Sequence, residues 1–336
     1  MNVIELTRAL VDIESVSDNE TEVGRFLHAH LSKLAADSGG CVERMAVEED
    51  RFNVFVAWGD PIVTLSTHMD TVPPFFPSRE EGEYIWGRGS CDAKGIIAAM
   101  VGAAEKLLAF GTKNFGLLFV VGEERNSAGA ITASKSPRGS RYLINGEPTE
   151  NKLALASKGV LRFELIARGR LAHSAYPELG ESAIEKLLDA LEAIRRVALP
   201  HHALLGPSTM NIGTITGGRA PNVIADSARA EILVRLVGDP ASIRESFAAA
   251  VGGRAELTEV LCIPAMEFER VGGYPTTVVS YTTDVPMFGG AWGQPLLLGP
   301  GSIHVAHTSE ERVAKSDLLQ AINLYADAVR RLQATC

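Results

Sequence analysis

The sequence predicts an α/β protein in which a smaller α+β domain is inserted into a larger domain. Up to about residue 157, short β-rich runs alternate with helix-period runs. The order changes to β-α-β-β-α-β over 158–263, after which mixed segments and a final helix follow. With 336 residues, 46% of them apolar and 22% charged, the chain is long enough for two globular domains.

The elements of the larger domain follow from hydrophobic periodicity. Apolar residues at helical spacing predict helices over 3–13 and 20–35, with polar capping residues between them. The small apolar residues of 95–110 predict a helix suited to close packing on a sheet, and a last helix is predicted over 316–333. The β-rich runs predict strands over 52–58, 62–67, 116–121, 141–145 and 296–298. The simplest architecture is a discontinuous domain made of 1–157 and 264–336.

The inserted segment has the order of an independent small domain. Alternating runs predict strands over 160–168, 210–216, 224–236 and 255–262, and helices over 181–197 and 240–251. This is the split-βαβ pattern of ferredoxin-like domains. We therefore expect a second domain over 158–263.

Composition and charge exclude several classes of protein. The net charge of −9 argues against nucleic-acid binding, which depends on a basic surface. No apolar run approaches the roughly 20 residues that span a bilayer, so no membrane partner is expected. The N-terminus has no basic start followed by an apolar block, and the four cysteines are scattered. We therefore expect a cytoplasmic protein with free thiols.

Histidine and carboxylate side chains follow the predicted strands of the larger domain. In open α/β sheets, ligands bind beyond the carboxyl ends of the strands, so these side chains are expected to meet at one edge. Asp92 stands just before the helix predicted at 95–110. The residues that follow strands are His68, Asp70, Glu123, Glu124, Glu147 and His307, with His304 as a competitor for the position of His307.

Two histidines with several carboxylates and no thiolate suit a pair of borderline divalent cations such as zinc. Asp92 is the candidate for a bridging ligand because it stands alone at the start of a helix. Asp70 lies two residues after His68, on the same face of an extended segment, as expected of a carboxylate that orients an imidazole. The adjacent Glu123 and Glu124 can divide into a general base and a metal ligand.

These residues lie in motifs that resemble one family, the dinuclear zinc hydrolases that include acetylornithine deacetylase, succinyl-diaminopimelate desuccinylase, aminoacylase and glutamate carboxypeptidase. The resemblance covers nearly the whole chain. Its motifs are Ser66-Thr67-His68-Met69-Asp70-Thr71-Val72-Pro73, Trp86-Gly87-Arg88-Gly89 leading to Asp92-Ala93-Lys94-Gly95, Gly122-Glu123-Glu124, Gly146-Glu147-Pro148-Thr149, and Ala306-His307 followed by Glu310 and Glu311.

The resemblance implies a role for each motif residue. It implies a mixed-sheet catalytic domain of the zinc-exopeptidase type, a cis peptide after Asp92, and an inserted lid that forms the interface of a homodimer. The implied metal ligands are His68, Asp92 and Glu147 for one cation and Asp92, Glu124 and His307 for the other. The other implied roles are those of Glu123 as the general base, Asp70 as the orienting carboxylate, His173 as the oxyanion donor across the dimer, and Asn222 and Arg235 as the substrate-binding residues. Turn and salt-bridge roles remain open for Asn222 and Arg235, and a plain surface role remains open for His173.

The resemblance implies a hydrolase that uses two divalent metal ions, zinc first and cobalt as the alternative, to cleave a C–N amide bond. Glu147 and its Gly-Glu-Pro-Thr motif resemble those of the deacylases, so we expect removal of an acyl group from a small N-acyl amino acid, a reaction of amino-acid metabolism. An aminopeptidase, dipeptidase or carboxypeptidase is the alternative within the family. The alternatives of another class are a metal-holding, peptide-binding module, against which the free carboxylate expected of Glu123 argues, and an acidic metal-storage protein, against which the single well-formed site and the substrate-like lid argue.

Overall fold

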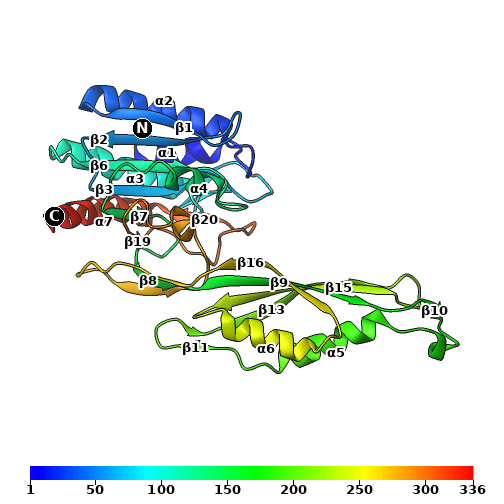
Figure 1. Cartoon of the computed structure of the whole chain (residues 1–336). Coiled ribbons are helices and arrows are strands. Elements are labelled where there is room, and N and C mark those ends of the chain that lie inside the picture. The colour runs from blue at the N-terminus through cyan, green and yellow to red at the C-terminus, as the bar shows by residue number, and fades with distance from the viewer. Residues whose placement is uncertain (336) are drawn as a thin grey trace. The chain divides into compact units, whose positions relative to one another are not determined.

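The computed structural model describes residues 1–335, which form two compact units (Figure 1). Unit 1 comprises Met1–Leu155, Phe268–Thr277 and Thr283–Cys336, and unit 2 comprises Ala156–Glu267 and Val278–Thr282. The sequence-based expectation for the inserted domain was 158–263. The short segment 278–282, which joins unit 2, was not anticipated from the sequence.

Unit 1 is built on a mixed sheet, which confirms the predicted fold class. Four neighbouring strands, β6, β3, β7 and β19, run parallel to one another. Antiparallel strands flank them on both sides. In order across the sheet the strands are β1 (Cys41–Ala46), β2 (Phe52–Trp58), β6 (Phe115–Val120), β3 (Val63–His68), β7 (Tyr142–Asn145), β19 (Gln294–Leu297) and β8 (Leu153–Ser157).

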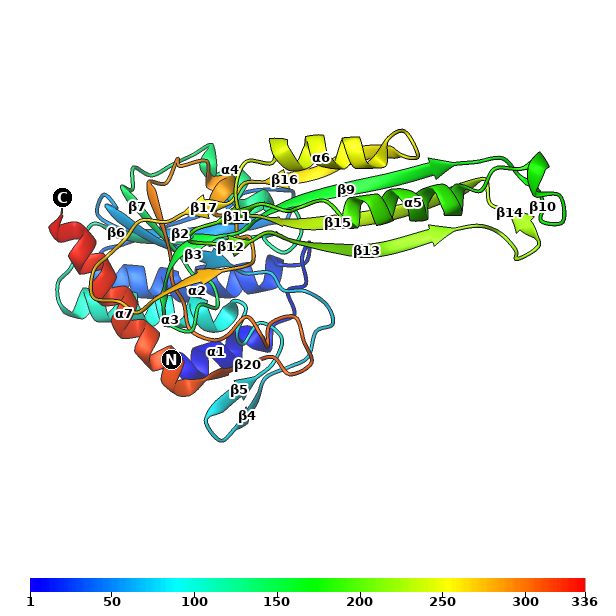
Figure 2. The same cartoon turned by 90° about the horizontal axis from the view of Figure 1, so that it is seen from below.

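Helices cover both faces of this sheet because its strands are apolar on both sides (Figures 1 and 2). In β2, Val54 and Val56 pack in the core with the four long helices, whereas Phe55 packs on the opposite face against Trp292, with ring centroids 5.6 Å apart. The first face carries α1 (Val3–Val11), α2 (Thr21–Ser38), α3 (Lys94–Ala109) and α7 (Lys315–Ala334). The second carries α4 (Ala128–Ser134) and the 3-10 helix η2 (Val285–Phe288).

The small residues of α3 have a packing reason. A Cβ added at Gly102 would lie 2.8 Å from Ile322 of α7, so glycine allows the two helices to approach closely. α3 is buried along nearly its whole length and starts two residues after Asp92. A rigid helix therefore fixes the position of this acid.

Unit 2 has the expected split-βαβ topology. Its antiparallel sheet has the order β13-β15-β9-β16, and α5 and α6 pack on one face of it (Figure 2). The elements are β9 (Gly159–Arg168), α5 (Ala183–Arg195), β13 (Thr209–Gly217), β15 (Ser227–Leu236), α6 (Ala241–Val251) and β16 (Glu256–Ile263). Shorter elements are β10 (Ala172–His173), the 3-10 helix η1 (Pro177–Leu179), β11 (His201–His202), β12 (Gly206–Pro207), β14 (Val223–Ile224) and β17 (Met266–Glu267).

The structure differs from the sequence prediction in strands that were not predicted and in one predicted strand that is interrupted. The exposed strand β1 and strand β8 were not predicted, and the run 224–236 is interrupted. The interruption is at Asp226, whose carbonyl oxygen accepts a hydrogen bond from the Gly169 amide and whose side chain bonds to Arg219. The remaining elements are β4 (Arg79–Glu81), β5 (Tyr84–Trp86) and β20 (Arg312–Ala314), which form a small sheet, and β18 (Thr276–Val279).

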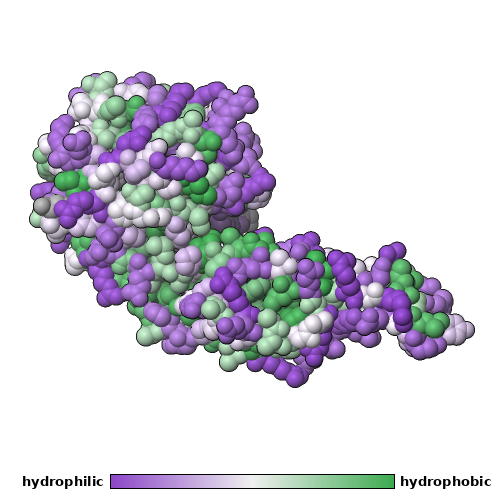
Figure 3. All heavy atoms as spheres, in the orientation of Figure 1, coloured by the Kyte–Doolittle hydropathy of each residue, from purple (hydrophilic) through white to green (hydrophobic). Residues whose placement is uncertain are grey.

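The surface drawn in Figure 3 is mostly hydrophilic, with small hydrophobic groups scattered among the charged residues. Among residues 1–335, the long helices are all too polar or too short to cross a membrane. The cysteines of this part of the chain, Cys41, Cys91 and Cys262, are free thiols. Cys336 lies outside the described residues.

Candidate metal centre

The parallel strands of unit 1 bring acidic and histidine side chains to one edge of the sheet. His68 is the last residue of β3, which lies between β6 and β7 in the sheet. Glu123 and Glu124 follow β6 on one side of β3, and Glu147 follows β7 on the other. Residues that are far apart in the sequence therefore converge, as expected from the carboxyl ends of parallel strands.

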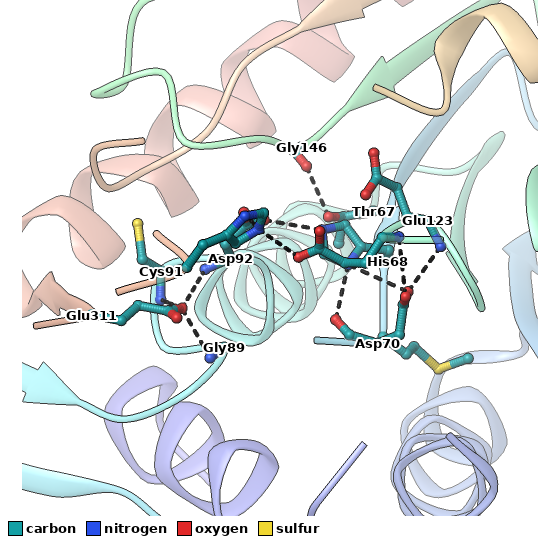
Figure 4. Close-up of polar contacts among 12 residues, drawn as sticks. Thr67, His68, Asp70, Gly89, Cys91, Asp92, Glu123, Gly146 and Glu311 are labelled. Carbon is teal, nitrogen blue, oxygen red and sulfur yellow. Dashed lines mark hydrogen bonds and ion pairs between the residues drawn. The ribbon is translucent and has the colours of Figure 1, made fainter. Parts of the chain in front are cut away.

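Asp92 lies between two imidazoles. Its Oδ1 is 3.0 Å from His68 Nε2 (Figure 4), and its Oδ2 is 3.4 Å from His307 Nε2. His307 Nε2 also lies 2.8 Å from Glu124 Oε1. Because each oxygen of one carboxylate faces a different imidazole, Asp92 is placed to bridge two cations. The alternative His304 is exposed and lies instead near Glu150.

The ligand atoms of His68, Asp92 and Glu124 lie within 4.8 Å of one another. Nitrogen and oxygen donors at this spacing fit a zinc-class divalent cation. A second observation points the same way, since Glu147 Oε1 is buried and has no hydrogen-bond partner among residues 1–335. Such an oxygen is expected to coordinate a cation, because an unpaired buried carboxylate is strongly destabilising.

In the absence of a cation, the protonation of the two imidazoles depends on burial and on the neighbouring carboxylates. Burial works against a charged His68, but its hydrogen bonds to Asp70 and Asp92 outweigh burial and hold its pKa well above the usual value. Hydrogen bonds to Asp92 and Glu124 raise the pKa of His307 to about 10. In the metal-free protein both imidazoles therefore favour the protonated form, and divalent cations bound between them and Asp92 would displace those protons.

Asp70 organises the loop after β6. Its Oδ1 accepts a hydrogen bond from the Glu123 amide at 3.0 Å, and its Oδ2 accepts one from the Glu124 amide at 3.1 Å. The Ser17 hydroxyl donates to the same Oδ2 at 2.6 Å. His68 Nδ1 is 3.0 Å from the Asp70 carbonyl oxygen and 3.5 Å from Oδ1. Asp70 therefore orients both an imidazole and the backbone of two acids.

Glu123 is placed as a carboxylate of high proton affinity. Burial raises its pKa well above the ordinary value, and the charge of Glu147 adds to this effect. Figure 4 shows the Glu123 side chain directed away from Asp70, although its amide donates to that residue. The same loop therefore separates the two acids as the sequence suggested, with Glu124 alone in contact with His307.

The three predicted residues of the inserted segment lie in unit 2. His173 and Asn222 are exposed and adjacent, because β10 pairs with β14 and the Ser174 amide donates to the Asn222 carbonyl oxygen at 3.0 Å. Arg235 lies near the other end of β15, where it pairs in register with Val160. Arg235 is half-buried, and burial lowers its pKa.

Other residues near the centre had no role assigned from the sequence. Glu311 was noted only as part of a motif, yet its buried carboxylate accepts hydrogen bonds from the backbone that leads to Asp92. Asp284 was not noted at all. Burial raises the pKa of Asp284 to about 7, with a smaller opposing effect from the Ser127 hydroxyl. No periodicity or local motif marks Asp284, because only the fold places it near these acids.

The peptide bond between Asp92 and Ala93 is cis, as the resemblance implied.

Comparison with known proteins agrees with the geometry. Residues 64–331 match the model of peptidase family M20/M25/M40. A peptidase M20 domain-containing protein of Schizosaccharomyces pombe is 40% identical over 336 residues, covering 96% of this chain and 83% of that protein. A probable carboxypeptidase of Aspergillus terreus is 38% identical over 361 residues, covering 95% and 83%.

The fold is also that of a solved M20 family metallo-carboxypeptidase from Sulfolobus solfataricus. The TM-score is 0.78 at 16% identity, and the match covers 99% of both chains. The family match, which includes all the residues gathered around Asp92, excludes the binding-module and metal-storage alternatives. The chain belongs to peptidase family M20/M25/M40 and is a hydrolase of amide bonds.

Proposed function

We propose that this enzyme uses two divalent metal ions, zinc or cobalt, to release an amino acid from an N-acyl linkage. The observation that carries the proposal is the position of Asp92, whose two oxygens each face a different imidazole. The proposed ligands are His68, Asp92 and Glu147 for one cation and Asp92, Glu124 and His307 for the other. When bound, such ions supply Lewis acidity and lower the pKa of water to near 7.

The protein's own contribution to the reaction centres on Glu123. Its raised pKa suits a group that must first accept a proton from the attacking water and then deliver it to the leaving amine. Asp70 holds the Glu123 amide and therefore fixes the position from which this side chain acts. In unit 2, His173 Nδ1 accepts a hydrogen bond from the Ala175 amide at 3.1 Å. This contact leaves the Nε2–H of neutral His173 free to donate to an oxyanion.

We infer that the substrate carries a free α-carboxylate. Arg235 is half-buried, and no acidic side chain pairs with it in the part of the chain that the structure describes. A desolvated guanidinium favours a carboxylate ligand because it can bind both oxygens at once. A peptide cut at its C-terminus and an N-acyl amino acid share this feature: in both, the leaving amine belongs to an amino acid with a free carboxylate.

Within this class, two acyl groups are candidates. A deacylase would remove a small acyl group, as the resemblance of Glu147 and its motif suggests. A carboxypeptidase would cut a peptidyl group, as the name of the relative from Aspergillus terreus suggests. An aminopeptidase acting on longer peptides is disfavoured to the extent that Arg235 needs a carboxylate close to the scissile bond, whereas a dipeptidase remains compatible because a dipeptide has that carboxylate.

We also propose that unit 2 serves as a lid and homodimer interface. Arg235 lies near one end of β15, whereas His173 and Asn222 lie beyond its other end, at the separate pair β10–β14; the stretch from Ser227 to Arg235 alone spans roughly 25 Å at about 3.3 Å per residue. A small substrate cannot span that distance, which supports the proposal that one site takes these residues from two subunits. The exposed apolar residues of unit 2 suit such an interface; they include Leu171, Leu179, Ile184, Leu188 and Ile215. A cytoplasmic location is part of the proposal, since free thiols suit a reducing compartment.

The activity is tested with the zinc- or cobalt-loaded protein on three groups of compounds. These are N-acetyl and N-succinyl amino acids including N-acetylornithine and N-succinyl-diaminopimelate, N-blocked dipeptides, and free di- and tripeptides, with each peptide tested both with a free and with an amidated C-terminus. Chelator-sensitive release of amino acid from the first or second group supports the proposal and identifies the acyl group. Cleavage of amidated peptides as fast as of their free-carboxylate counterparts would refute the inference about Arg235.

Variants assign the roles. Glu123→Gln is expected to retain both metal ions and lose about 100- to 10,000-fold in kcat, the usual contribution of a general base. Arg235→Met is expected to raise KM and to have its main effect on substrates with a free carboxylate. Glu245→Gln changes another acid, outside the centre, and is expected to leave kcat unchanged. Metal loss in Glu123→Gln would contradict the assignment of a base.

Sharing of the site is tested by mixing two inactive variants, Glu123→Ala and His173→Ala. If His173 acts on the partner's site, a mixed dimer has one site with both groups intact. Random pairing of equal amounts would then restore about a quarter of wild-type activity. No recovery, in a mixture shown to exchange subunits, would place His173 in its own subunit's site or outside the mechanism.

A further inference from the structure

Glu311 is a fully buried acid that binds the backbone of a ligand-bearing segment. Its Oε1 accepts hydrogen bonds from the amides of Gly89 at 2.9 Å, Asp92 at 3.1 Å and Cys91 at 3.3 Å. Its Oε2 accepts a hydrogen bond from Arg88 Nη1. Figure 4 shows Glu311 on the side of Asp92 that faces away from His68. Four donors therefore surround one carboxylate.

The geometry of the 87–92 segment is shaped to fit this carboxylate. Gly87 and Gly89 have φ angles of 144° and 86°, a region that side chains rarely allow. With these conformations the amides of Gly89, Cys91 and Asp92 point toward one carboxylate and form an anion-binding concavity, while the Ser90 amide donates to the Gly87 carbonyl oxygen. Arg88 is itself fixed, since its Nε donates to the Pro74 carbonyl oxygen at 3.2 Å and its guanidinium lies 5.0 Å from the centre of the Phe76 ring.

Glu311 also connects two segments that supply metal ligands. It lies four residues after His307, and its own carbonyl oxygen accepts a hydrogen bond from the Gly87 amide at 3.1 Å. Its side chain holds the Asp92 amide. His307 and Asp92 face each other at 3.4 Å, so the spacing between these two ligands depends on how their segments are joined. Glu311 supplies that join through both its backbone and its side chain.

We propose that Glu311 is a positioning residue for the cation site formed by Asp92, Glu124 and His307. The inference rests on the two-metal centre proposed above and adds a determinant of its geometry. Glu311 does not coordinate a metal ion: its four hydrogen bonds use both oxygens. It acts by fixing the Asp92 backbone relative to His307, which sets the separation of the donor atoms.

The test compares Glu311→Gln with Glu20→Gln in the full-length protein. Glu20 is a matched control because it is 1% exposed and forms a similarly buried pair with Arg51, through two contacts of 2.8 Å. Both variants lose one buried charge. Only the Glu311 variant also loses the charged acceptor for the amides before Asp92, while its remaining carbonyl oxygen preserves the shape needed for folding.

Cobalt binding to each metal-free protein is followed by calorimetry and by the visible absorption of the bound ion. Glu311→Gln is expected to weaken one of two cobalt equivalents by about 10- to 100-fold and to change its spectrum, as for other residues that orient metal ligands. Glu20→Gln is expected to bind both equivalents as the wild type does. With saturating metal, kcat of Glu311→Gln should fall more than KM changes.

Two results would overturn the inference, and they differ in meaning. If the wild type binds two cobalt ions and Glu311→Gln binds both with unchanged affinity and spectrum, Glu311 has only a structural role and the proposed function stands. If the wild type binds no cobalt, the two-metal centre itself is refuted and the inference falls with it.

Discussion

Replacing Asp70 by asparagine tests how the centre is held together. The substitution keeps the shape of the side chain but removes its charge and exchanges one acceptor oxygen for a donor NH₂. In the structure, both oxygens accept from backbone amides, those of Glu123 and Glu124. Whichever way the asparagine is oriented, one of these amides faces another donor. The Ser17 hydroxyl can rotate to accept a hydrogen bond, so the orientation that places NH₂ at the Oδ2 position is favoured.

The size of the effect follows from these contacts. A hydrogen bond to a charged group contributes about 1.5–3 kcal/mol, and a buried donor left without an acceptor is destabilising by about 1–3 kcal/mol. With Asp70 fully buried, we expect Asp70→Asn to lower the free energy of unfolding by about 2–4 kcal/mol. Loss of the orienting carboxylate is also expected to lower kcat/KM by about 10- to 100-fold.

Denaturant unfolding of the metal-free protein and steady-state kinetics of the loaded protein measure the two effects. Asp12→Asn is the control: Asp12 also accepts a backbone amide, that of Ser78 at 2.6 Å, but it is exposed and bonds to a segment without metal ligands. The control should change kcat/KM less than threefold. If Asp70→Asn behaved like Asp12→Asn in both measurements, the argument that Asp70 organises the Glu123–Glu124 loop would be refuted.

Three further predictions concern protons and packing. Hydrogen bonds raise the pKa of His307 to about 10 in the metal-free protein, so metal binding at pH 7.5 should release the proton of His307 and should become tighter as the pH rises. Calorimetry in two buffers of different ionisation enthalpy measures the number of protons released. Burial lowers the pKa of Lys94 from 10.5 to about 7, so the unfolded chain binds more protons than the folded protein between these pH values. The free energy of unfolding of the metal-free protein should therefore rise with pH in this range, by at most about 1.4 kcal/mol per pH unit. Denaturant titrations at pH 7.5 and 9.5 measure this rise, and Lys94→Met should flatten it. Gly299→Ala places a Cβ 2.4 Å from the Glu147 carbonyl oxygen, so it should lower the free energy of unfolding by about 1–3 kcal/mol and weaken metal binding. The control Gly238→Ala has open space around the added Cβ and should change neither property.

The sequence was sufficient for the part of the centre that depends on strand order. His68, Glu124 and Glu147 each follow an apolar strand, and parallel strands necessarily bring such residues to one edge. The alternation of β-rich and helix-period runs was clear because the central strands are buried on both faces. By contrast, β1 was missed because only one of its residues, Met45, is buried, so it carries little apolar signal.

Contacts that depend on tertiary structure were not predictable from local patterns. Glu311 binds amides that lie about 220 residues earlier in the chain, and no periodicity links those positions. Asp284 precedes a short 3-10 helix in a segment rich in turn residues, so nothing local distinguishes it from an exposed acid. The interruption of the run 224–236 likewise depends on Asp226 bonding with Arg219 and Gly169, which only the folded domain brings together.

Two carboxylates that neither coordinate metal nor act as the general base in this scheme, Asp70 and Glu311, share one mode of action. Asp70 accepts the amides of Glu123 and Glu124, and Glu311 accepts the amides of the segment that ends at Asp92. Each therefore fixes the backbone of a ligand-bearing segment by hydrogen bonds that need no metal ion. Asp70 also adds negative charge close to an already acidic cluster, which favours cations and disfavours an empty site, whereas the charge of Glu311 is paired with that of Arg88. Both acids thus position the ligands before metal binds, and Asp70 in addition increases the attraction for metal.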